Sequence, residues 1–380
     1  MKIAQLTPYY NPHHGGVESF VRDLSTQLSA RGHDVTVITS WYDRSLAERE
    51  EADGVRIIRV PLVATILRTP IPRGLKHVFE RERFDIVHSH TPSPSFAYIP
   101  ARMLMKSGVP TVVTYHCDSD IPSRMSSLFV RGVDRFVTRR IIQRSTKVLV
   151  TTKTYSSTSS NVWTIEPEIV PVSANTDRFH PDREDRARTR RKFNLEGKKA
   201  VLFVGRLVRH KGVQFLIESM RYLPNDCVLL IAGEGEYSGT LGRIIRGLGV
   251  GGRVFMLGGI PDNLLPSLYR AADVVVVPST ARLEAFSIAA IESMASGTPV
   301  LVSNIPGVRE VIEDGVHGLR SEPMDPRNIA DRLKELLSNE ELRRRMGENG
   351  VKRAAEFSIS SVAERMLSIY SGLLKSDNPE

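Results

Sequence analysis

The sequence predicts an α/β protein made of two Rossmann-like halves that face each other across a cleft. Strand-sized apolar runs alternate with amphipathic helical segments along most of the chain. The alternation breaks in the polar stretch Val172–Arg186 and then starts again. The length of 380 residues also exceeds the usual size of one domain. We therefore expect a first domain over residues 1–172, a linker over 173–186, a second domain over 187–357 and a terminal helix within 358–380.

The first half begins with a strand–helix–strand unit. Apolar side chains recur at helical spacing over Val17–Ala30, and Gly32 follows where a helix would end. The short apolar runs on either side of this helix are expected to be parallel strands. The strands expected in this half are residues 2–6, 35–39, 84–90, 110–116 and 147–152, and a second helix is expected over 96–105.

The second half repeats the same alternation. Runs such as Val274–Val277 have the length and apolar character of strands that are buried on both faces. The strands expected here are residues 200–206, 228–233, 253–258, 273–279, 299–303 and 318–320. The expected helices are residues 213–220, 238–248, 264–271, 284–296, 326–337, 340–356 and 362–374.

Composition limits the class of protein. The chain has 41% hydrophobic and 25% charged residues, which is typical of a globular protein. No apolar run approaches the roughly 18 residues needed to span a bilayer, and the start, MKIAQLTPYY, is typical of a strand and not of a signal peptide. Cys117 and Cys227 form neither a disulfide framework nor a metal spacing, which favours a reducing, cytoplasmic location. The net charge of +9 favours anionic partners: phosphate-bearing small molecules, nucleic acid or an anionic membrane.

The first strand-to-helix loop, TPYYNPHHGGVES, is a candidate ligand site because doubly wound sheets bind ligands beyond the carboxyl ends of their strands. Gly15 and Gly16 permit close approach of a ligand to a helix start, where free N–H groups attract an anion. Tyr9 and Tyr10 can stack on a ring-shaped ligand. The alternatives are a flexible turn before a helix and two packing tyrosines.

A histidine and two aspartates follow the strand that ends at Tyr115. A single histidine after a strand is more often structural than catalytic, although His116 lies on the expected cleft side. Asp118 and Asp120 form a D-x-D spacing that can chelate a divalent ion. The cations described next are the favoured alternative for neutralising an anion, so no metal site is predicted.

The loop VGRLVRHKGV follows the first strand of the second half. Arg206 and Lys211 lie just before a helix, flanked by Gly205 and Gly212, where two cations and a helix N-terminus would suit a diphosphate. The order of residues is not that of a Walker loop. The alternative is an exposed basic turn. The nearby AGEGEYSG fails as a dinucleotide fingerprint because its third glycine position holds Ser238 and its glutamates would repel phosphate.

The stretch LEAFSIAAIESMASGTPVLVS carries the strongest signal. We expect its helix to begin just after Glu284, with the first-turn N–H groups of Ser287 and Ile288 open to an anion. Glu292 follows Glu284 by eight positions, about 80° around a helix, so the two can share one side. Each carboxylate suits a pair of vicinal hydroxyls, as in a sugar or a ribose. The alternative is a half-buried helix whose glutamates contact solvent or arginines.

Residues Arg124–Lys147 interleave apolar residues with six arginines. This pattern predicts a basic amphipathic helix that contacts an anionic lipid surface. The alternative is a helix with its apolar face on the core and its arginines in solvent.

Taken together, these motifs resemble the retaining GT-B glycosyltransferases of the large family, group 1 or family four, that includes sucrose-phosphate synthases and bacterial phosphatidylinositol mannosyltransferases. The resemblance covers essentially the whole chain, through PYYNPHHGGVESF, DIVHSHTPSP, TYHCD, VGRLVRHKGVQFLIESM, AGEGE and EAFSIAAIESMASGTPVLVSNIPGVREVIEDGVHGL. The last block is the most specific, because it combines two glutamates at a fixed spacing with Gly-Thr-Pro-Val.

This resemblance implies a GT-B architecture with an acceptor-side first domain, a nucleotide-sugar-binding second domain and a C-terminal helix that packs back on the first. It implies transfer of a hexose, of mannose or glucose type, from a GDP- or UDP-linked donor. The acceptor would be a sugar or a polyprenyl- or phospholipid-type lipid. Transfer would retain the anomeric configuration by front-face attack, without a metal or another cofactor.

Roles for the phosphate contacts follow from the same resemblance. Arg206 and Lys211 would clamp the diphosphate in place of a metal ion. The backbone after Phe286, at Ser287 and Ile288, would bind the β-phosphate. The family usually has glycine at the position of Ser287, so its side chain is expected to narrow the sugar pocket.

The sugar and nucleoside contacts are also implied. Glu284 would hold hydroxyls of the donor sugar, and Glu292 would hold those of the ribose. Gly16 would approach the donor phosphate or the reaction centre, and His116 would lie beside the transferred sugar and help to stabilise charge. The base would lie near Ile260. The linker residues Ala174–Asp177, ANTD where the family has Gly-Val-Asp, are expected to affect only a hinge.

Other functions of the same fold are a nucleotide-sugar epimerase, a sugar phosphorylase and a non-catalytic nucleotide-binding protein. Nucleic-acid binding is not favoured, because the aromatic-plus-basic platforms typical of single-strand binders are not evident. The expected location is the cytoplasm, with peripheral contact at the inner face of the membrane.

Overall fold

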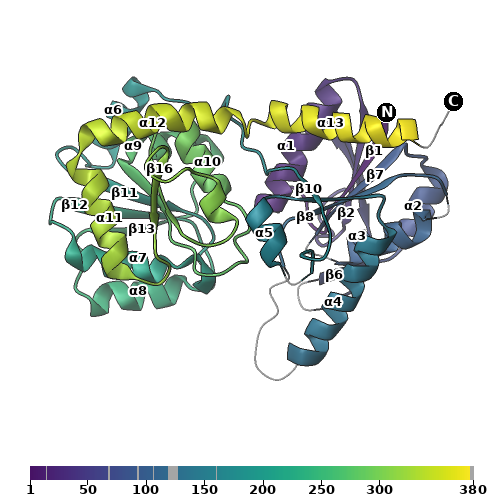
Figure 1. Ribbon diagram of the computed structural model, residues 1–380, viewed down its shortest axis with the longest axis horizontal. Helices are drawn as coiled ribbons and strands as arrows, with labels where there is room; N and C mark the ends of the chain where they lie inside the picture. The colour runs from purple at the N-terminus through teal and green to yellow at the C-terminus, as the bar shows by residue number, and fades with distance from the viewer. Residues whose placement is uncertain are drawn as a thin grey trace. The chain divides into compact units, whose positions relative to one another are not determined.

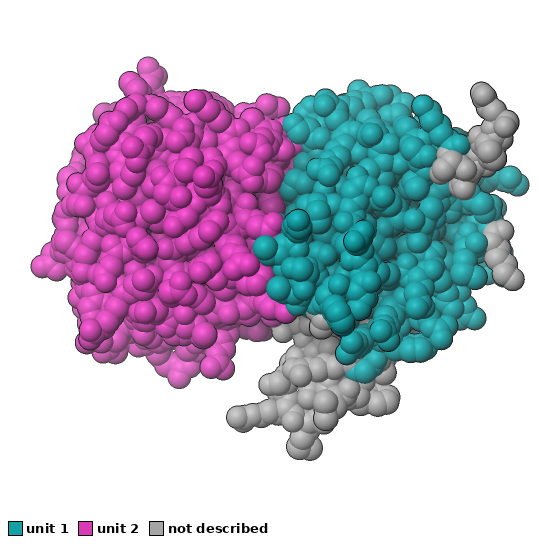
Figure 2. Space-filling model, in the orientation of Figure 1, with its two compact units in different colours: residues 1–172, 359–380 teal, residues 173–358 magenta. Residues whose placement is uncertain are grey.

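The computed structural model describes residues 1–13, 15–66, 69–91, 94–105, 107–118, 127–159 and 161–376. The chain divides into two compact units, which Figure 1 shows as ribbons and Figure 2 shows in two colours. Unit 1 contains residues 1–172 and 359–380, and unit 2 contains residues 173–358. Among the described helices, none has the length and hydropathy of a bilayer-spanning segment.

Unit 1 is built on an eight-stranded sheet with the order β10-β9-β8-β7-β1-β2-β4-β3, in which only β3 runs antiparallel to its neighbour. A separate antiparallel pair is formed by β5 and β6. The strands of unit 1 are β1 (Lys2–Leu6), β2 (Asp34–Ser40), β3 (Arg49–Ala52), β4 (Val55–Val60), β5 (Leu62–Ile66), β6 (Thr69–Pro72), β7 (Ile86–Thr91), β8 (Thr111–Tyr115), β9 (Lys147–Val150) and β10 (Glu168–Ile169). Its helices are α1 (Gly16–Ala30), α2 (Leu75–Arg81), α3 (Pro94–Leu104), α4 (Ser127–Arg144), α5 (Lys153–Thr158) and α13 (Ile359–Ser376).

Unit 2 is built on a six-stranded, fully parallel sheet with the order β13-β12-β11-β14-β15-β16. Its strands are β11 (Lys199–Val204), β12 (Cys227–Ala232), β13 (Val254–Gly258), β14 (Val274–Val277), β15 (Val300–Ser303) and β16 (Gly318–Ser321). Its α-helices are α6 (Arg183–Lys192), α7 (Val213–Ser219), α8 (Ser238–Gly247), α9 (Leu265–Ala271), α10 (Ile288–Ala295), α11 (Pro326–Ser338) and α12 (Glu340–Ala355). Short 3-10 helices are η1 (Arg209–Lys211), η2 (Met220–Tyr222), η3 (Asp262–Leu264) and η4 (Val308–Glu310).

The core of unit 2 follows from strands that are mainly apolar, so that both of their faces can be buried. Alternate residues of a strand point to opposite faces of the sheet. Accordingly, Leu202 and Val275 belong to one buried cluster, and Val201 and Val274 to another. Two covered faces explain the runs of valine and leucine, because a parallel sheet is buried on both sides. Each unit is thus a doubly wound α/β domain, and the predicted fold class is confirmed.

Two segments differ from expectation. Residues 49–81 contain four strands and a helix that the apolar pattern did not predict, and their turn Asp53-Gly54 is a typical hairpin sequence. Residues 173–186, expected to be a linker, lie within unit 2, where α6 already begins at Arg183. The polar character of this stretch arises because Arg186 forms an ion pair with Asp273 at 2.6 Å.

Candidate active site

The strand order of unit 2 creates a switch point between β11 and β14. These strands are neighbours, with Val201 opposite Val274, and the chain continues from them toward opposite edges of the sheet. Doubly wound sheets bind ligands beyond the carboxyl ends of the strands at such a point. The loops that follow the two strands hold residues 205–212 and 278–287. The predicted cations and the first predicted glutamate lie in these loops.

Backbone contacts join the two loops. The carbonyl oxygen of His210 accepts hydrogen bonds from the N–H of Thr280 at 2.8 Å and from its hydroxyl at 3.2 Å. Gly212 has a φ of +72°, and a Cβ on it would lie 1.9 Å from the carbonyl oxygen of Pro278. Glycine is required for this conformation and this approach. The loop after β11 is therefore held against the loop after β14.

Lys211 and Glu284 form an ion pair at this junction, between Nζ and Oε2. Their side chains are 23% and 9% exposed, so the pair is largely withdrawn from water, where charges interact more strongly. The pair presents an ammonium group and a carboxylate at the switch point. Such a combination suits a ligand that carries both an anionic group and hydroxyls.

Arg206 lies earlier in the same loop and is exposed. In the described part of the chain its guanidinium has no ion-pair partner. Its backbone is fixed by its neighbours, since Leu207 donates its N–H to the carbonyl oxygen of Glu234 at 2.7 Å. A Cβ on Gly235 would lie 2.2 Å from the carbonyl oxygen of Leu207, which explains a glycine at that position in AGEGE. The loop after β12 thus supports the loop that carries Arg206.

The loop after β13 is tied to the same group of loops. The carboxylate Oε1 of Glu234 accepts a hydrogen bond from the N–H of Gly259 at 3.2 Å, and Gly258 accepts one from the N–H of Gly233 at 2.7 Å. Ile260 follows directly and packs partly buried against the core. The Glu234 carboxylate is therefore hydrogen-bonded to the protein backbone, and Ile260 lies at the carboxyl edge of the sheet.

The expected helix over residues 284–296 is shorter than predicted. α10 begins at Ile288, so Glu284 lies in the preceding turn, where its N–H donates to the carbonyl oxygen of Ala281 at 3.1 Å. The prediction that Glu284 and Glu292 share one side of a helix is therefore wrong. The two glutamates are separated because Ser287 is the N-cap of the helix.

Ser287 caps α10 with its side chain, which accepts a hydrogen bond from the N–H of Ala290 at 3.3 Å. The residue is 1% exposed and its hydroxyl faces the helix, while its effect on the width of a sugar pocket stays a prediction. The N–H groups of Ser287 and Ile288 donate to no acceptor among the described residues. Unsatisfied N–H groups at the start of a helix form a natural anion site.

Glu292 lies within α10 and is half-buried. Its Oε2 accepts a hydrogen bond from the hydroxyl of Tyr269 at 2.7 Å. Tyr269 is fully buried, and burial, with Glu292 nearby, raises its pKa well above the ordinary value. The tyrosine therefore stays protonated and fixes the orientation of the carboxylate.

The tyrosines of the first loop of unit 1 have different environments. Tyr10 is 3% exposed, and burial raises its pKa to about 12, so the structure favours the packing alternative for this residue. Tyr9 is less buried and stacks on the ring of His13 with centroids 4.6 Å apart. Of the two, only Tyr9 is accessible enough to contact an acceptor.

Gly15 and Gly16 lie at the start of α1, where Gly15 is the N-cap. The carboxylate of Glu18 folds back over this helix start, because a Cβ on Gly15 would lie 2.2 Å from Oε2 of Glu18. Glu18 also lies 3.3 Å from Nδ1 of His13. An internal carboxylate thus neutralises the N-terminus of α1. Sequence reasoning missed this residue, although an acidic residue at the third helical position is a common capping signal.

His116 follows β8 and is 6% exposed. Burial lowers its pKa to about 3, so the imidazole is neutral at physiological pH. Asp118 is held by the protein, since its Oδ1 accepts hydrogen bonds from the hydroxyls of Tyr115 at 2.9 Å and Ser159 at 2.8 Å. Asp120 lies outside the described residues. No group of three or more potential metal ligands occurs in the described chain.

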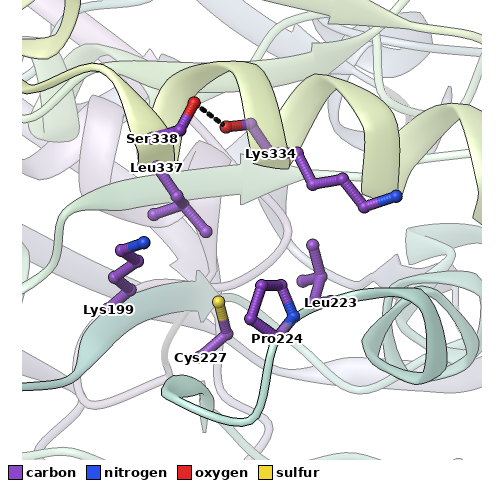
Figure 3. Close-up of a pocket in the computed structure, with 7 residues that line it drawn as sticks. All are labelled: Lys199, Leu223, Pro224, Cys227, Lys334, Leu337 and Ser338. Atoms are coloured by element: carbon purple, nitrogen blue, oxygen red, sulfur yellow. Dashed lines mark hydrogen bonds between the residues drawn. The ribbon is translucent and has the colours of Figure 1, made fainter.

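A small hollow of about 60 Å³ lies at the other end of the unit 2 sheet (Figure 3). It is lined by Lys199 and Cys227 at the starts of β11 and β12, and by Leu337 of α11. Burial raises the pKa of the Cys227 thiol to about 11, so this cysteine is not a reactive nucleophile. The hollow is remote from the carboxyl ends of the strands and takes no part in the candidate site.

Comparisons with known proteins agree with this arrangement. The family model for Glycosyltransferase Family 4 matches residues 14–178, and the model for glycosyl transferases group 1 matches residues 185–353. The D-inositol 3-phosphate glycosyltransferase of Frankia alni is 31% identical over 388 residues, with 94% of each chain covered. Sucrose-phosphate synthase from Thermosynechococcus elongatus has a TM-score of 0.84 at 24% identity, with 99% of each chain covered. Anabaena HepE, solved in complex with UDP-glucose, has a TM-score of 0.78 at 19% identity, with 98% of this chain and 100% of that chain covered.

Two Rossmann-like domains show the GT-B fold, and the matches to both family models make the chain a glycosyltransferase. The chain belongs to the group 1, family four glycosyltransferases, which confirms the resemblance inferred from its motifs.

Proposed function

We propose that this glycosyltransferase moves a hexose of mannose or glucose type from a GDP- or UDP-linked donor to an acceptor, with retention of configuration. The observation that carries this proposal is the Lys211–Glu284 pair beside the unsatisfied N–H groups of Ser287 and Ile288. The ammonium group of Lys211 and the two N–H groups suit a diphosphate, and the carboxylate of Glu284 suits sugar hydroxyls.

In the proposed ground state, Lys211 and Arg206 contact the diphosphate, together with the backbone N–H groups after Phe286. Glu284 then accepts hydrogen bonds from hydroxyls of the donor sugar. Glu292, oriented by Tyr269, accepts those of the ribose, and the base lies near Ile260. Gly15 and Gly16 allow close approach of the donor, which requires the Glu18 carboxylate to move aside.

The proposed chemical step breaks the bond between the anomeric carbon and the diphosphate oxygen, whose electron pair stays with the phosphate. The acceptor oxygen forms the new bond on the same face, and its proton passes to the leaving phosphate. No protein nucleophile is needed. The contribution of the protein is positioning and charge stabilisation, which Lys211 and Arg206 supply without a metal ion.

A panel of GDP- and UDP-linked hexoses tests the proposal. The purified chain is expected to release nucleoside diphosphate from one donor in the presence of acceptors such as inositol phosphate, simple sugars or polyprenyl phosphate. The product should keep the donor's anomeric configuration, and EDTA should leave the rate unchanged. Interconversion of sugars without diphosphate release would identify an epimerase, and sugar release with inorganic phosphate would identify a phosphorylase. Binding of a nucleotide without turnover would identify a non-catalytic protein.

We further propose that α4 contacts an anionic membrane, which would bring a lipid-linked acceptor to a protein otherwise located in the cytoplasm. Phe136 is 56% exposed, and the guanidinium of Arg140 lies 4.8 Å from the centre of its ring. Arg135 and Arg139 on the same helix are also exposed. An exposed aromatic ring among arginines is typical of a surface that binds acidic lipid. Residues 124–126 of the predicted basic segment lie outside the described residues.

Co-sedimentation with vesicles checks the membrane contact. Arg139→Gln/Arg140→Gln should reduce binding to vesicles with acidic lipid by about tenfold or more, since each cation contributes about 1 kcal/mol. The matched control is Arg191→Gln/Lys192→Gln, which removes two exposed charges from α6 and should have little effect. Equal loss in both variants would show nonspecific charge attraction, and wild-type binding to neutral vesicles would contradict the proposal.

A further inference from the structure

One face of the unit 1 sheet carries a row of buried polar side chains near the carboxyl ends of its strands. Gln5 of β1 lies opposite His88 of β7, and His90 lies opposite Thr114 of β8. Each of these residues is 0% or 1% exposed. His116 continues the row at the end of β8.

Hydrogen bonds connect these side chains into one network. Nδ1 of His88 lies 2.6 Å from the hydroxyl of Tyr370 in α13, and Nδ1 of His90 lies 3.0 Å from Nε2 of His116. Gln5 joins the two halves, because its Nε2 donates to the Tyr370 hydroxyl at 3.3 Å and its Oε1 lies 2.8 Å from Nε2 of His90.

The direction of each hydrogen bond near His116 follows from Gln5. An amide oxygen can only accept, so His90 must carry its hydrogen on Nε2. A neutral imidazole has one N–H, and Nδ1 of His90 is therefore an acceptor. His116 must then donate from Nε2, which leaves the lone pair of His116 on Nδ1. Nδ1 of His116 has no hydrogen-bond partner among the described residues.

We propose that Gln5 and His90 are positioning residues that fix His116 as the Nε2–H tautomer, so that its Nδ1 presents a hydrogen-bond acceptor to the donor sugar. This inference rests on the proposed function and on the place beside the transferred sugar that the family resemblance implies for His116. If the Gln5 amide had the opposite orientation, the Gln5–His90 and His90–His116 hydrogen bonds would both reverse direction. Nδ1 of His116 would then carry the hydrogen and be a donor. The amide of Gln5 therefore sets the chemical character of His116.

The environment keeps this network neutral. Burial lowers the pKa of His88 to about 3 and that of His90 well below its ordinary value, and the neighbouring histidines lower both further. Phe20 of α1 covers the pair, with its ring 5.9 Å from that of His90 and 5.4 Å from that of His116. A neutral imidazole with an exposed lone pair can accept from a sugar hydroxyl and favours positive charge at the anomeric carbon.

The tautomer can be measured directly in the free protein. With ¹⁵N-labelled histidine, correlation spectra are expected to show a hydrogen on Nε2 and an acceptor lone pair on Nδ1 of His116. His90→Leu removes the acceptor, and we expect a mixture of tautomers together with a ten- to hundredfold lower kcat and little change in donor KM. His90→Asn places an oxygen near the position of Nδ1, so it should restore most of the single tautomer and most of the kcat. A hydrogen on Nδ1 in the wild type, or an unchanged tautomer in His90→Leu, would overturn the inference.

A matched control separates positioning from stability. His88→Asn alters an equally buried imidazole that contacts Tyr370 and Thr114 but not His116. The asparagine oxygen lies near the position of Nδ1 and can still accept from the hydroxyl of Tyr370, so Gln5 keeps its orientation and the tautomer of His116 should be unchanged even if the protein becomes less stable. The spectra need no turnover, so absence of diphosphate release from every donor would disprove the proposed function without affecting this result.

Discussion

Replacing Lys211 with Met is expected to lower the rate of sugar transfer by about 10²- to 10³-fold, because the leaving diphosphate loses a preorganised positive charge. Arg206→Ala should have an effect of similar size. The measurement is release of nucleoside diphosphate at saturating donor and acceptor. Wild-type rates in either variant would contradict the proposed clamp.

Stability measurements distinguish catalysis from folding in this experiment. Glu284 is 8% exposed, so Lys211→Met leaves a buried carboxylate without its cation, and the free energy of unfolding should fall by about 1–3 kcal/mol. Lys211→Met/Glu284→Gln removes both charges and should regain stability but not turnover. Arg206→Ala should leave stability unchanged, because this side chain is exposed. Recovery of turnover in the double variant would show that Lys211 serves only to neutralise Glu284.

Acidification from pH 7.5 to 5.5 is expected to destabilise unit 1 by about 4 kcal/mol, from three buried histidines at about 1.4 kcal/mol each. His88, His90 and His116 have folded pKa values lowered by burial. Unfolded histidine has a pKa near 6.5, so below that pH the unfolded chain binds more protons and stability falls. The loss stops growing as pH passes the folded pKa, about 3 for His88 and His116.

Amide hydrogen exchange measures this effect in each unit separately. Protection factors, which allow for the slower intrinsic exchange at lower pH, should fall strongly over the interval for amides in β1, β7 and β8. Protection in β11 and β14 serves as the internal control, because carboxylates stay ionised over this range and His317 of unit 2, whose pKa is lowered by burial, is only partly buried. Equal changes in both sheets, or none in β7, would contradict neutral burial of the histidines.

The fold was largely predictable because its buried parallel strands are short runs of mainly apolar residues. Val274–Val277 and Lys2–Leu6 were therefore found at or near their observed bounds. Within the segment 49–81, β3 and β5 gave no apolar pattern because β3 is fully exposed and β5 nearly so, whereas β4 is buried and was missed despite its apolar residues. A strand at the edge of a sheet carries little of the pattern on which such predictions depend.

The candidate site was predictable as a set of loops but not as a geometry. The loops that contain Lys211 and Gly16 were predicted from glycines just before helices, because tight turns and close approaches of the backbone require glycine. The predicted placement of Glu284 and Glu292 on one helix was wrong, because Ser287 is the N-cap of α10 and Glu284 lies in the turn before it. Glu18, Tyr269 and Gln5 were missed because their roles arise from contacts between residues far apart in the sequence or folded back on a helix start.

The division of the chain has a consequence for its synthesis. Unit 2 is one continuous stretch, whereas unit 1 needs residues from both ends of the chain. Tyr370 bonds to Gln5 and His88, so a ribosome must translate all of unit 2 before this histidine row can close. Until then Gln5 and His88, which are buried in the finished protein, lack the hydroxyl of Tyr370 as their hydrogen-bond partner. Completion of α13 therefore acts as the closing event in the assembly of a site whose other parts were translated hundreds of residues earlier.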